Sequence, residues 1–270
     1  MTTHFGATLR MLRIDAGLGL GELAARIGVS SAYLSRVEHG HDPVPTHDRV
    51  IAIAQALELP PIVLLEIAQG AGAALASYLE RVPEASSLFL EMATRELGAV
   101  EIARIKAFID RTLPARGANR RKPARLGELL DPKRVLVRAV CSDIEDLVSV
   151  ASTRIASDRA ETKRLVAKLL DREDSASSAM GAGVIVPHAI IPGEPSRAVL
   201  VVLARPIKDR TPDGVPIKTG IVLVEPAADR AHLERLAHIA RLAARGLANA
   251  VEHARTPDEA LRQLAALDVS

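Results

Sequence analysis

The chain has 270 residues, of which 48 % are hydrophobic and 25 % charged, so it is long and apolar enough to build two domain cores. Its formal net charge of +2 excludes a strongly basic or acidic surface overall, and any basic surface must be local. The single cysteine, Cys141, excludes internal disulfides and thiolate zinc clusters and fits a reducing compartment. No signal peptide, membrane span, P-loop, dinucleotide fingerprint or zinc spacing occurs, so we expect a cytoplasmic protein with no membrane contact, no cofactor and no metal.

The first part of the chain carries the pattern of two short helices joined by a tight turn. A first helix is expected to end over Arg10–Asp15, and a second to cover Glu22–Ile27. Ser30 can then cap a third helix over Ser31–His39, which Gly40 ends. Apolar residues at helical spacing predict its core. These core positions are Leu9, Leu12, Leu23, Ala24, Ile27, Val29, Leu34, Val37, Val50, Ile53, Ala54 and Leu57.

This layout resembles the Cro/lambda-repressor-type (XRE family) helix-turn-helix domain. The matching segments are Gly17-Leu18, Glu22-Leu23-Ala24, Gly28-Val29-Ser30, Leu34 to Glu38 with Gly40, and Ile53 to Leu57. The resemblance implies a DNA-binding domain over residues 1–70 that binds double-stranded DNA as a homodimer. It implies that the groove-facing residues are Ser31, Ala32, Tyr33, Ser35 and Arg36. Arg36 would bind a guanine and Ala32 a thymine methyl group, while Arg13 and Glu38 match a buried structural pair.

Two features depart from that family's pattern. Gly19-Leu20 stands where a Ser/Thr-Gln pair is usual, which removes a helix cap and a common DNA contact. Residues 1–70 also hold five arginines, no lysine and seven acids, a weak electrostatic footprint for a DNA-binding protein. The alternative is a helix-turn-helix retained for protein contacts.

Residues 71–111 are predicted to be a helical connector. Three helices are expected, over Ala74–Glu80, Glu84–Leu97 and Val100–Arg111, and their apolar stripes suit either a local core or dimerisation. Residues 112–125 form a basic linker, which is either a solvated hinge or a source of added phosphate contacts. Its basic residues are Arg116, Arg120, Arg121, Lys122 and Arg125.

A glycine-rich loop, a short apolar strand and a Pro-His pair follow one another within Arg172–Ala189. Val184–Val186 are predicted to form a buried strand, and Pro187 would leave His188 at the strand edge, where its imidazole can meet another molecule. With Arg172, Ser177 and Ser178 upstream, this arrangement suits accepting and returning a phosphoryl group. A lone histidine after a strand is also common as a satisfied structural residue, and the residues alone leave both interpretations open.

The segment resembles the active-site motif of enzyme IIA domains of the bacterial phosphotransferase system, of the fructose/mannitol and nitrogen-regulatory type (type 2). Arg172-Glu173, Ser177, Gly181, Gly183 and Pro187-His188 all fall in place, while Ser178, Ala182 and Ala189 replace the usual Thr, Asn and Gly. The resemblance extends over residues 126–270, and it implies an α/β domain with a mixed sheet and helices. It also implies that His188 is the phosphoryl acceptor, that His232 lies beside it, and that Arg172, Ser177 and Ser178 belong to the same site.

Together the two resemblances imply a multidomain bacterial transcriptional regulator, all-α at its N-terminus. Its IIA-like domain would sense the state of the phosphotransferase system, with a phosphocarrier protein of that system, or a related protein, as partner. The first alternative is an enzyme component that passes phosphate to another protein of a sugar or nitrogen phosphotransferase system. The second is a IIA-like domain that binds a protein or metabolite without being phosphorylated.

Overall fold

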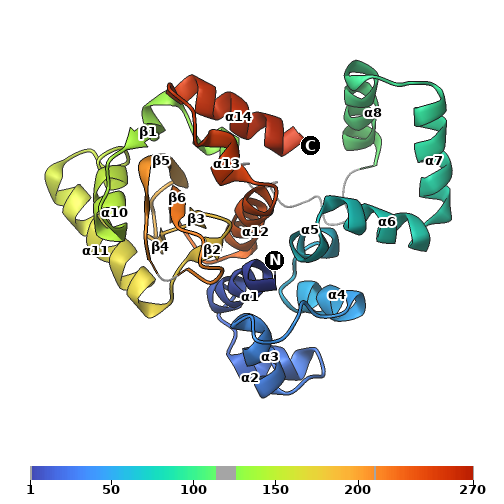
Figure 1. Ribbon diagram of the computed structural model, residues 1–270, viewed down its shortest axis with the longest axis horizontal. Helices are drawn as coiled ribbons and strands as arrows, with labels where there is room; N and C mark the ends of the chain where they lie inside the picture. Colours follow the sequence, from blue (N-terminus) through green and yellow to red (C-terminus); the bar gives the residue numbers. More distant parts are fainter. Residues whose placement is uncertain (1, 114–125, 210, 270) are drawn as a thin grey trace.

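The computed structural model describes residues 2–113, 126–209 and 211–269, which form a helical N-terminal unit and a C-terminal unit built on a mixed sheet (Figure 1). This confirms the predicted fold class. None of the helices in these described parts is long and apolar enough to cross a membrane.

The N-terminal unit is a bundle of five helices around one apolar core. Its helices are α1 (Thr2–Asp15), α2 (Leu20–Arg26), α3 (Ser31–Glu38), α4 (His47–Ala56) and α5 (Pro61–Gln69). The Ser30 hydroxyl caps α3 by accepting the Tyr33 N–H at 3.2 Å, as its position in the sequence predicts. Arg13 binds the buried Glu38 carboxylate through two hydrogen bonds of 2.6 and 2.8 Å, which ties α1 to α3.

The connector forms an arm of three helices that extends away from both units (Figure 1). It comprises α6 (Ala71–Arg81), α7 (Pro83–Thr94) and α8 (Ala99–Thr112), so all three predicted helices are present. The basic residues from Arg116 to Arg125 lie outside the described residues.

The C-terminal unit holds a six-stranded sheet in the order β1-β5-β6-β3-β2, with β4 also paired to β6. β5 and β6 run antiparallel, whereas β1, β3 and β4 pair in parallel with their neighbours in this central pair. The strands are β1 (Val135–Ala139), β2 (Ala179–Gly181), β3 (Val184–Ile185), β4 (His188–Ile190), β5 (Arg197–Ile207) and β6 (Ile217–Glu225). The remaining elements are α9 (Leu126–Leu129), the 3-10 turn η1 (Pro132–Arg134), α10 (Ile144–Ser152), α11 (Arg159–Ser175), α12 (Arg230–Ala244), α13 (Leu247–Val251) and α14 (Pro257–Val269).

Helices cover both faces of the sheet, which explains why β5 and β6 are almost continuously apolar. Along β5, Ala198, Leu200 and Val202 face α12–α14, whereas the alternate residues face α10 and α11.

The two units pack directly against each other. α1 contacts both β2 and α12, and α5 contacts α12. One continuous apolar cluster therefore runs from Phe5 and Leu9 of α1 to Leu236 of α12. Glu66 of α5 adds a polar contact by binding Arg245, just after α12. The N-terminal unit is thus seated on the sheet face that carries α12, with its helix α1 against the glycine-rich loop.

Candidate functional site

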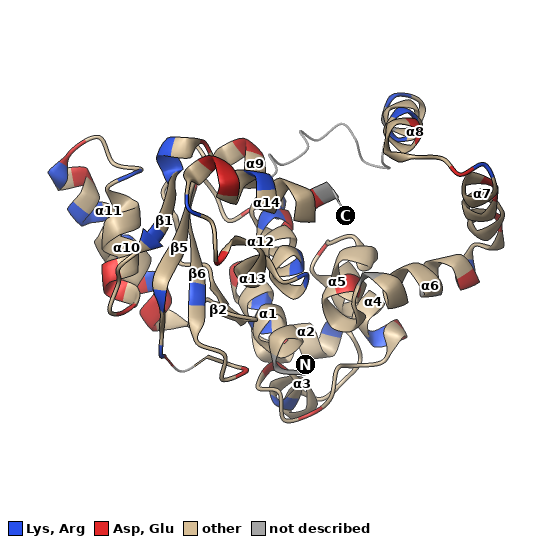
Figure 2. Cartoon of the chain, turned by 45° about the horizontal axis from the view of Figure 1, so that its top comes forward, with Lys and Arg blue, Asp and Glu red and all other residues tan. Residues whose placement is uncertain are grey.

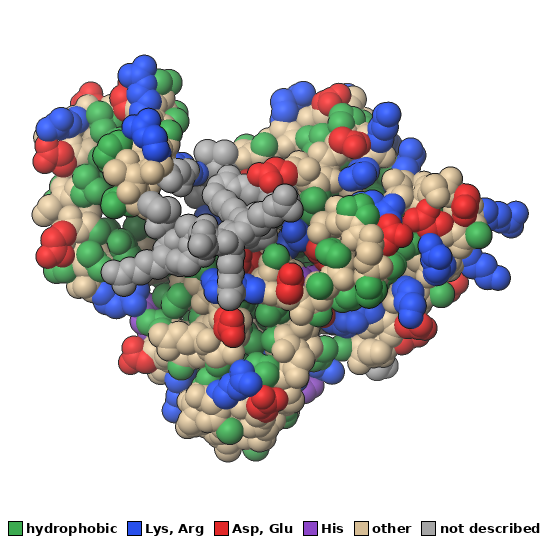
Figure 3. All heavy atoms as spheres, turned by 180° about the vertical axis from the view of Figure 1, so that it is seen from behind, with side chains coloured by type: hydrophobic (Ala, Val, Ile, Leu, Met, Phe, Trp, Pro, Cys, Tyr) green, Lys and Arg blue, Asp and Glu red, His purple; other side chains and the backbone are tan. Residues whose placement is uncertain are grey.

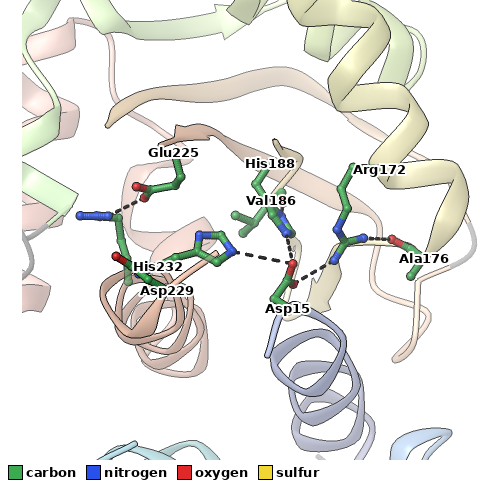
Figure 4. Close-up of polar contacts among 9 residues, drawn as sticks. Asp15, Arg172, Ala176, Val186, His188, Glu225, Asp229 and His232 are labelled. Atoms are coloured by element: carbon green, nitrogen blue, oxygen red, sulfur yellow. Dashed lines mark hydrogen bonds and ion pairs between the residues drawn. The ribbon is translucent and has the colours of Figure 1, made fainter. Parts of the chain in front are cut away.

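His188 lies at the start of β4, facing the C-terminal end of α1 (Figure 4). The sequence predicted a histidine displayed at a strand edge, and this is wrong for the conformation described, because His188 is only 1 % exposed. The reason is tertiary: helix α1, more than 170 residues earlier in the chain, covers the imidazole with its last residue, Asp15.

Both ring nitrogens of His188 have defined partners. Nδ1 lies 2.8 Å from the carbonyl oxygen of Val186, and Nε2 lies 3.0 Å from Oδ1 of Asp15. A carbonyl and a carboxylate can only accept hydrogen bonds, so each of these nitrogens donates a proton. The Val186 contact fixes the orientation of the ring independently of Asp15.

His232 lies beside His188, as the family resemblance implies. It stands in the first turn of α12, whose N-cap Asp229 accepts the His232 backbone N–H at 3.0 Å. The two imidazole centroids are 5.4 Å apart, and His232 Nε2 is 3.7 Å from the same Asp15 oxygen. Neither ring nitrogen of this buried side chain has a hydrogen-bond partner within the described parts of the chain. Both nitrogens could therefore form a hydrogen bond with a group bound beside His188.

Arg172, near the end of α11, is the third side chain beside Asp15. Its Nη2 donates to Oδ2 of Asp15 at 2.9 Å, and its Nη1 donates to the Ala176 carbonyl at 2.8 Å. Its buried Nε has no partner among the residues that the structure describes. Arg172, His188 and His232 come from three different elements and converge on one carboxylate (Figure 4).

The electrostatics favour a negative charge at this point. Burial alone would raise the pKa of Asp15, but hydrogen bonding to His188, the nearby His232 and the charge of Arg172 outweigh it. The pKa of Asp15 therefore lies far below its ordinary value. The carboxylate stays ionised, and the site is built to hold an anion.

A cavity of about 320 Å³ opens beside this carboxylate. Lys168 and Asp171 of α11 line it together with Asp15, Arg172, His188, Ala189 and Ile190. One ligand atom each of Asp15, His188 and His232 lies within 4.8 Å of the others, a spacing that a metal ion could bridge. The Arg172 guanidinium on the same carboxylate places a positive charge there already, so the site suits an anion better than a cation.

The two serines of the predicted site have other partners. Ser178 is buried, and its hydroxyl and backbone N–H both donate to the Glu173 carboxylate. Ser177 is exposed, and its hydroxyl accepts the Ala179 N–H at 3.3 Å. These bonds fix the loop between α11 and β2, so in this conformation the serines shape the loop that leads to His188.

The predicted DNA-contacting residues lie on the outer surface of α3. Ser31, Ala32 and Arg36 are exposed, and Tyr33 and Ser35 are half-buried. Arg36 also binds Asp42, with both carboxylate oxygens 3.1 Å from its Nε. Figure 2 shows basic and acidic residues interspersed over the chain, so any basic DNA-binding surface is local.

Three residues with a place at these sites were missed from the sequence. Arg49 of α4 lies over the Tyr33 ring, 5.0 Å from its centroid, and adds a positive charge beside α3. Lys168 lines the cavity near His188. Asp15 could have been suspected, because an acid in the last turn of a helix opposes the helix dipole and needs a tertiary partner.

Two family models match the chain. Residues 128–266 match the model described as "Phosphoenolpyruvate-dependent sugar phosphotransferase system, EIIA 2". Residues 4–66 match the model described as "Helix-turn-helix domain".

Curated relatives match each part separately. The "HTH-type transcriptional repressor RghR" of Bacillus subtilis is 37 % identical over 81 residues, which are 30 % of this chain, and the chain spans only 54 % of that repressor. The "Nitrogen regulatory protein" of Bradyrhizobium diazoefficiens is 30 % identical over 118 residues, which are 43 % of this chain and 77 % of the relative.

Two solved structures align with about half of the chain. Nitrogen regulatory protein IIA-Ntr from Neisseria meningitidis aligns with 52 % of this chain and 98 % of its own, at 20 % identity and a TM-score of 0.45. IIA mannitol from Escherichia coli aligns with 50 % of this chain and 98 % of its own, at 14 % identity and a TM-score of 0.41.

Proposed function

Because this chain belongs to the EIIA type 2 family of the phosphoenolpyruvate-dependent sugar phosphotransferase system, we propose that it is a transcriptional regulator that accepts a phosphoryl group on His188. The N-terminal helix-turn-helix would bind operator DNA, and the phosphorylation state of the C-terminal unit would be its input. The donor would be a phosphohistidine on a carrier protein of the phosphotransferase system or a related protein.

The observation that carries this proposal is the convergence of His188 Nε2 and Arg172 on one anionic group. The Val186 carbonyl fixes the Nδ1 proton, so Nε2 is the nitrogen left to act as nucleophile once its own proton is gone. Arg172 and His232 are placed to bind oxygens of a phosphoryl group on Nε2, because they already lie next to the carboxylate oxygens at that point.

The transfer step follows from this geometry. The Nε2 lone pair forms a bond to phosphorus, the bond between phosphorus and the donor's imidazole nitrogen breaks, and its electron pair stays with the donor ring. The Arg172 guanidinium would stabilise the negative charge of the phosphoryl group during transfer, while the Val186 carbonyl keeps the His188 ring in place.

Phosphorylation of the purified chain tests the proposal. Incubation with phosphoenolpyruvate, enzyme I and the carrier protein should add one acid-labile phosphate, and His188→Ala should abolish it. His253→Ala is the matched control, because His253 is exposed, lies outside the site and should leave incorporation unchanged. Intact wild-type mass with no added phosphate would instead favour a IIA-like domain that regulates without being phosphorylated.

We also propose that the α6–α8 arm joins two copies of the chain. Ten of the thirteen exposed large hydrophobic side chains among the described residues lie between Leu75 and Leu113. They include Phe89 and Phe108, two of only three phenylalanines in the sequence. Figure 3 shows such side chains at the surface of the arm. An apolar surface of this kind is typical of a protein interface, and a dimer would present two α3 helices to two half-sites.

A further inference from the structure

We propose that the Asp15 carboxylate occupies the place of the phosphoryl group, so that docking of α1 and phosphorylation of His188 exclude each other. The chain's own helix-turn-helix unit would thus be a regulatory partner of the phosphorylation site, and phosphorylation would release it. This inference rests on the proposed function, because it takes His188 as the acceptor.

The position of Asp15 indicates that its carboxylate occupies the space that a phosphoryl group on His188 would need. Its two oxygens lie 3.0 Å from His188 Nε2 and 2.9 Å from Arg172 Nη2, and only 7 % of its side chain is exposed. A phosphorus atom attacked by Nε2 has to approach within about 3–3.5 Å of that nitrogen. Asp15 fills this space, so no donor can reach His188 while α1 is docked.

The hydrogen bonds of the His188 ring are a second obstacle to its phosphorylation while α1 is docked. An Nε2 that donates its hydrogen bond to Asp15 has no lone pair free for attack on phosphorus, and the Val186 carbonyl accepts from Nδ1 in the same way. Withdrawal of Asp15 removes the acceptor that holds the Nε2 proton, while the Val186 contact and the orientation of the ring remain. The docked ring is therefore correctly oriented but chemically inert.

The reverse argument applies once phosphate is attached. A phosphoryl group carries close to two negative charges at neutral pH. It would meet the Asp15 carboxylate in the same space and take over Arg172 as its partner. Asp15 also stands at the C-terminal, negative end of α1, so Arg172 and the two neighbouring imidazoles are what make its position favourable.

Displacement of α1 by the phosphoryl group would move the whole N-terminal unit. α1 is part of the rigid core of that unit through Leu9, Leu12 and the Arg13–Glu38 ion pair. A displacement of α1 from the site would therefore carry the rest of that unit with it. Further polar contacts between the described parts of the two units join His4 to the Met180 carbonyl, and Glu66 to Arg245 and Arg241.

The test compares Asp15→Ala and Asp15→Asn with Asp48→Asn in the full chain. Asp48 is an exposed acid of α4 and serves as the matched control. The initial rate of phosphorylation by the carrier protein should rise by roughly 5- to 150-fold in both Asp15 variants, the range usual for coupling between two sites. It should stay at the wild-type value in Asp48→Asn.

A distance measurement supplies the second readout. Labels at Ala25→Cys on α2 and Lys163→Cys on α11, both exposed positions, are introduced with Cys141→Ser. Their separation should increase and broaden after phosphorylation of the otherwise wild-type chain, and in Asp15→Ala without phosphate. With His188→Ala, incubation with the donor system should change nothing.

The outcomes separate the two proposals. If no variant incorporates phosphate, the proposed function fails and this inference fails with it. If wild type and the Asp15 variants are phosphorylated at the same rate and the label distance does not change, the proposed function stands and the inference is overturned.

Discussion

At the scale of single residues, Asp15 links pH to the stability of the docked chain. Its pKa is lower in the folded protein than in the unfolded chain, so its contribution is fully present above its ordinary value near pH 4 and is lost as pH falls below that. Asp15→Asn should therefore lower the free energy of unfolding at pH 7, and the deficit should shrink steadily below pH 4. Denaturant unfolding of both proteins across pH 2–7 measures this, and a deficit that does not vary with pH would contradict it.

Arg36 is the residue whose removal should change DNA recognition most directly. If its guanidinium contacts a guanine, Arg36→Ala should weaken operator binding by about 1–3 kcal/mol and relax the preference at one base pair. Arg95→Ala is a suitable control, because Arg95 is also exposed and paired with an acid, Glu91, but lies just after α7, away from α3. An equal loss on operator and random DNA would make Arg36 a phosphate contact.

At the scale of elements, the β2–β3 hairpin contains a residue that its turn does not favour. Ala182 and Gly183 form a two-residue loop, and both have positive φ, +53° and +76°. Such turns favour Asn-Gly, because an alanine in this region is strained by about 1–2 kcal/mol, whereas asparagine tolerates it. Ala182→Asn should raise the free energy of unfolding by about 0.5–1 kcal/mol, and Ala182→Val should lower it. Equilibrium denaturation of the three proteins decides the matter, and destabilisation by asparagine would contradict the argument.

Helices and strands with local signals were predictable, whereas their long-range partners were not. The Ser30 cap and Gly28 indicated the helix-turn-helix, and the apolar run Val184–Val186 indicated the strand β3, because caps, turns and short apolar runs depend on neighbouring residues. His188, His232 and Arg172 were placed in one site by resemblance. The contact of Asp15 with that site was not predictable, because 173 residues separate it from His188 and no local pattern joins the two units. The bonds of Ser178 to Glu173 were missed for a related reason, since spacing does not tell which acceptor a hydroxyl chooses.

At the scale of the whole molecule, the proposed dimer depends on the apolar surface of the arm. Phe108→Glu would place a charge in the buried interface and should convert a dimer into a monomer, since an unpaired charge is costly to bury. Val140→Glu is the control, because Val140 is 86 % exposed and belongs to the sheet unit. Sedimentation at several protein concentrations measures the mass, and a wild-type monomer or an unchanged dimer in Phe108→Glu would refute the arm as interface.

The docking of α1 on His188, the proposed phosphoryl acceptor, also has a kinetic consequence. Asp15 belongs to the same chain as His188, so it competes with the phosphoryl donor for His188 at an effective concentration in the millimolar range. This effective concentration does not depend on the amount of protein. Under the proposed mechanism, a carrier protein would arrive by diffusion and would react only during the intervals in which the units are apart. The phosphorylation rate should therefore level off at the opening rate as carrier concentration increases. Operator DNA that binds the separated form more tightly would lengthen those intervals, and by thermodynamic reciprocity phosphate on His188 would strengthen DNA binding by the same factor.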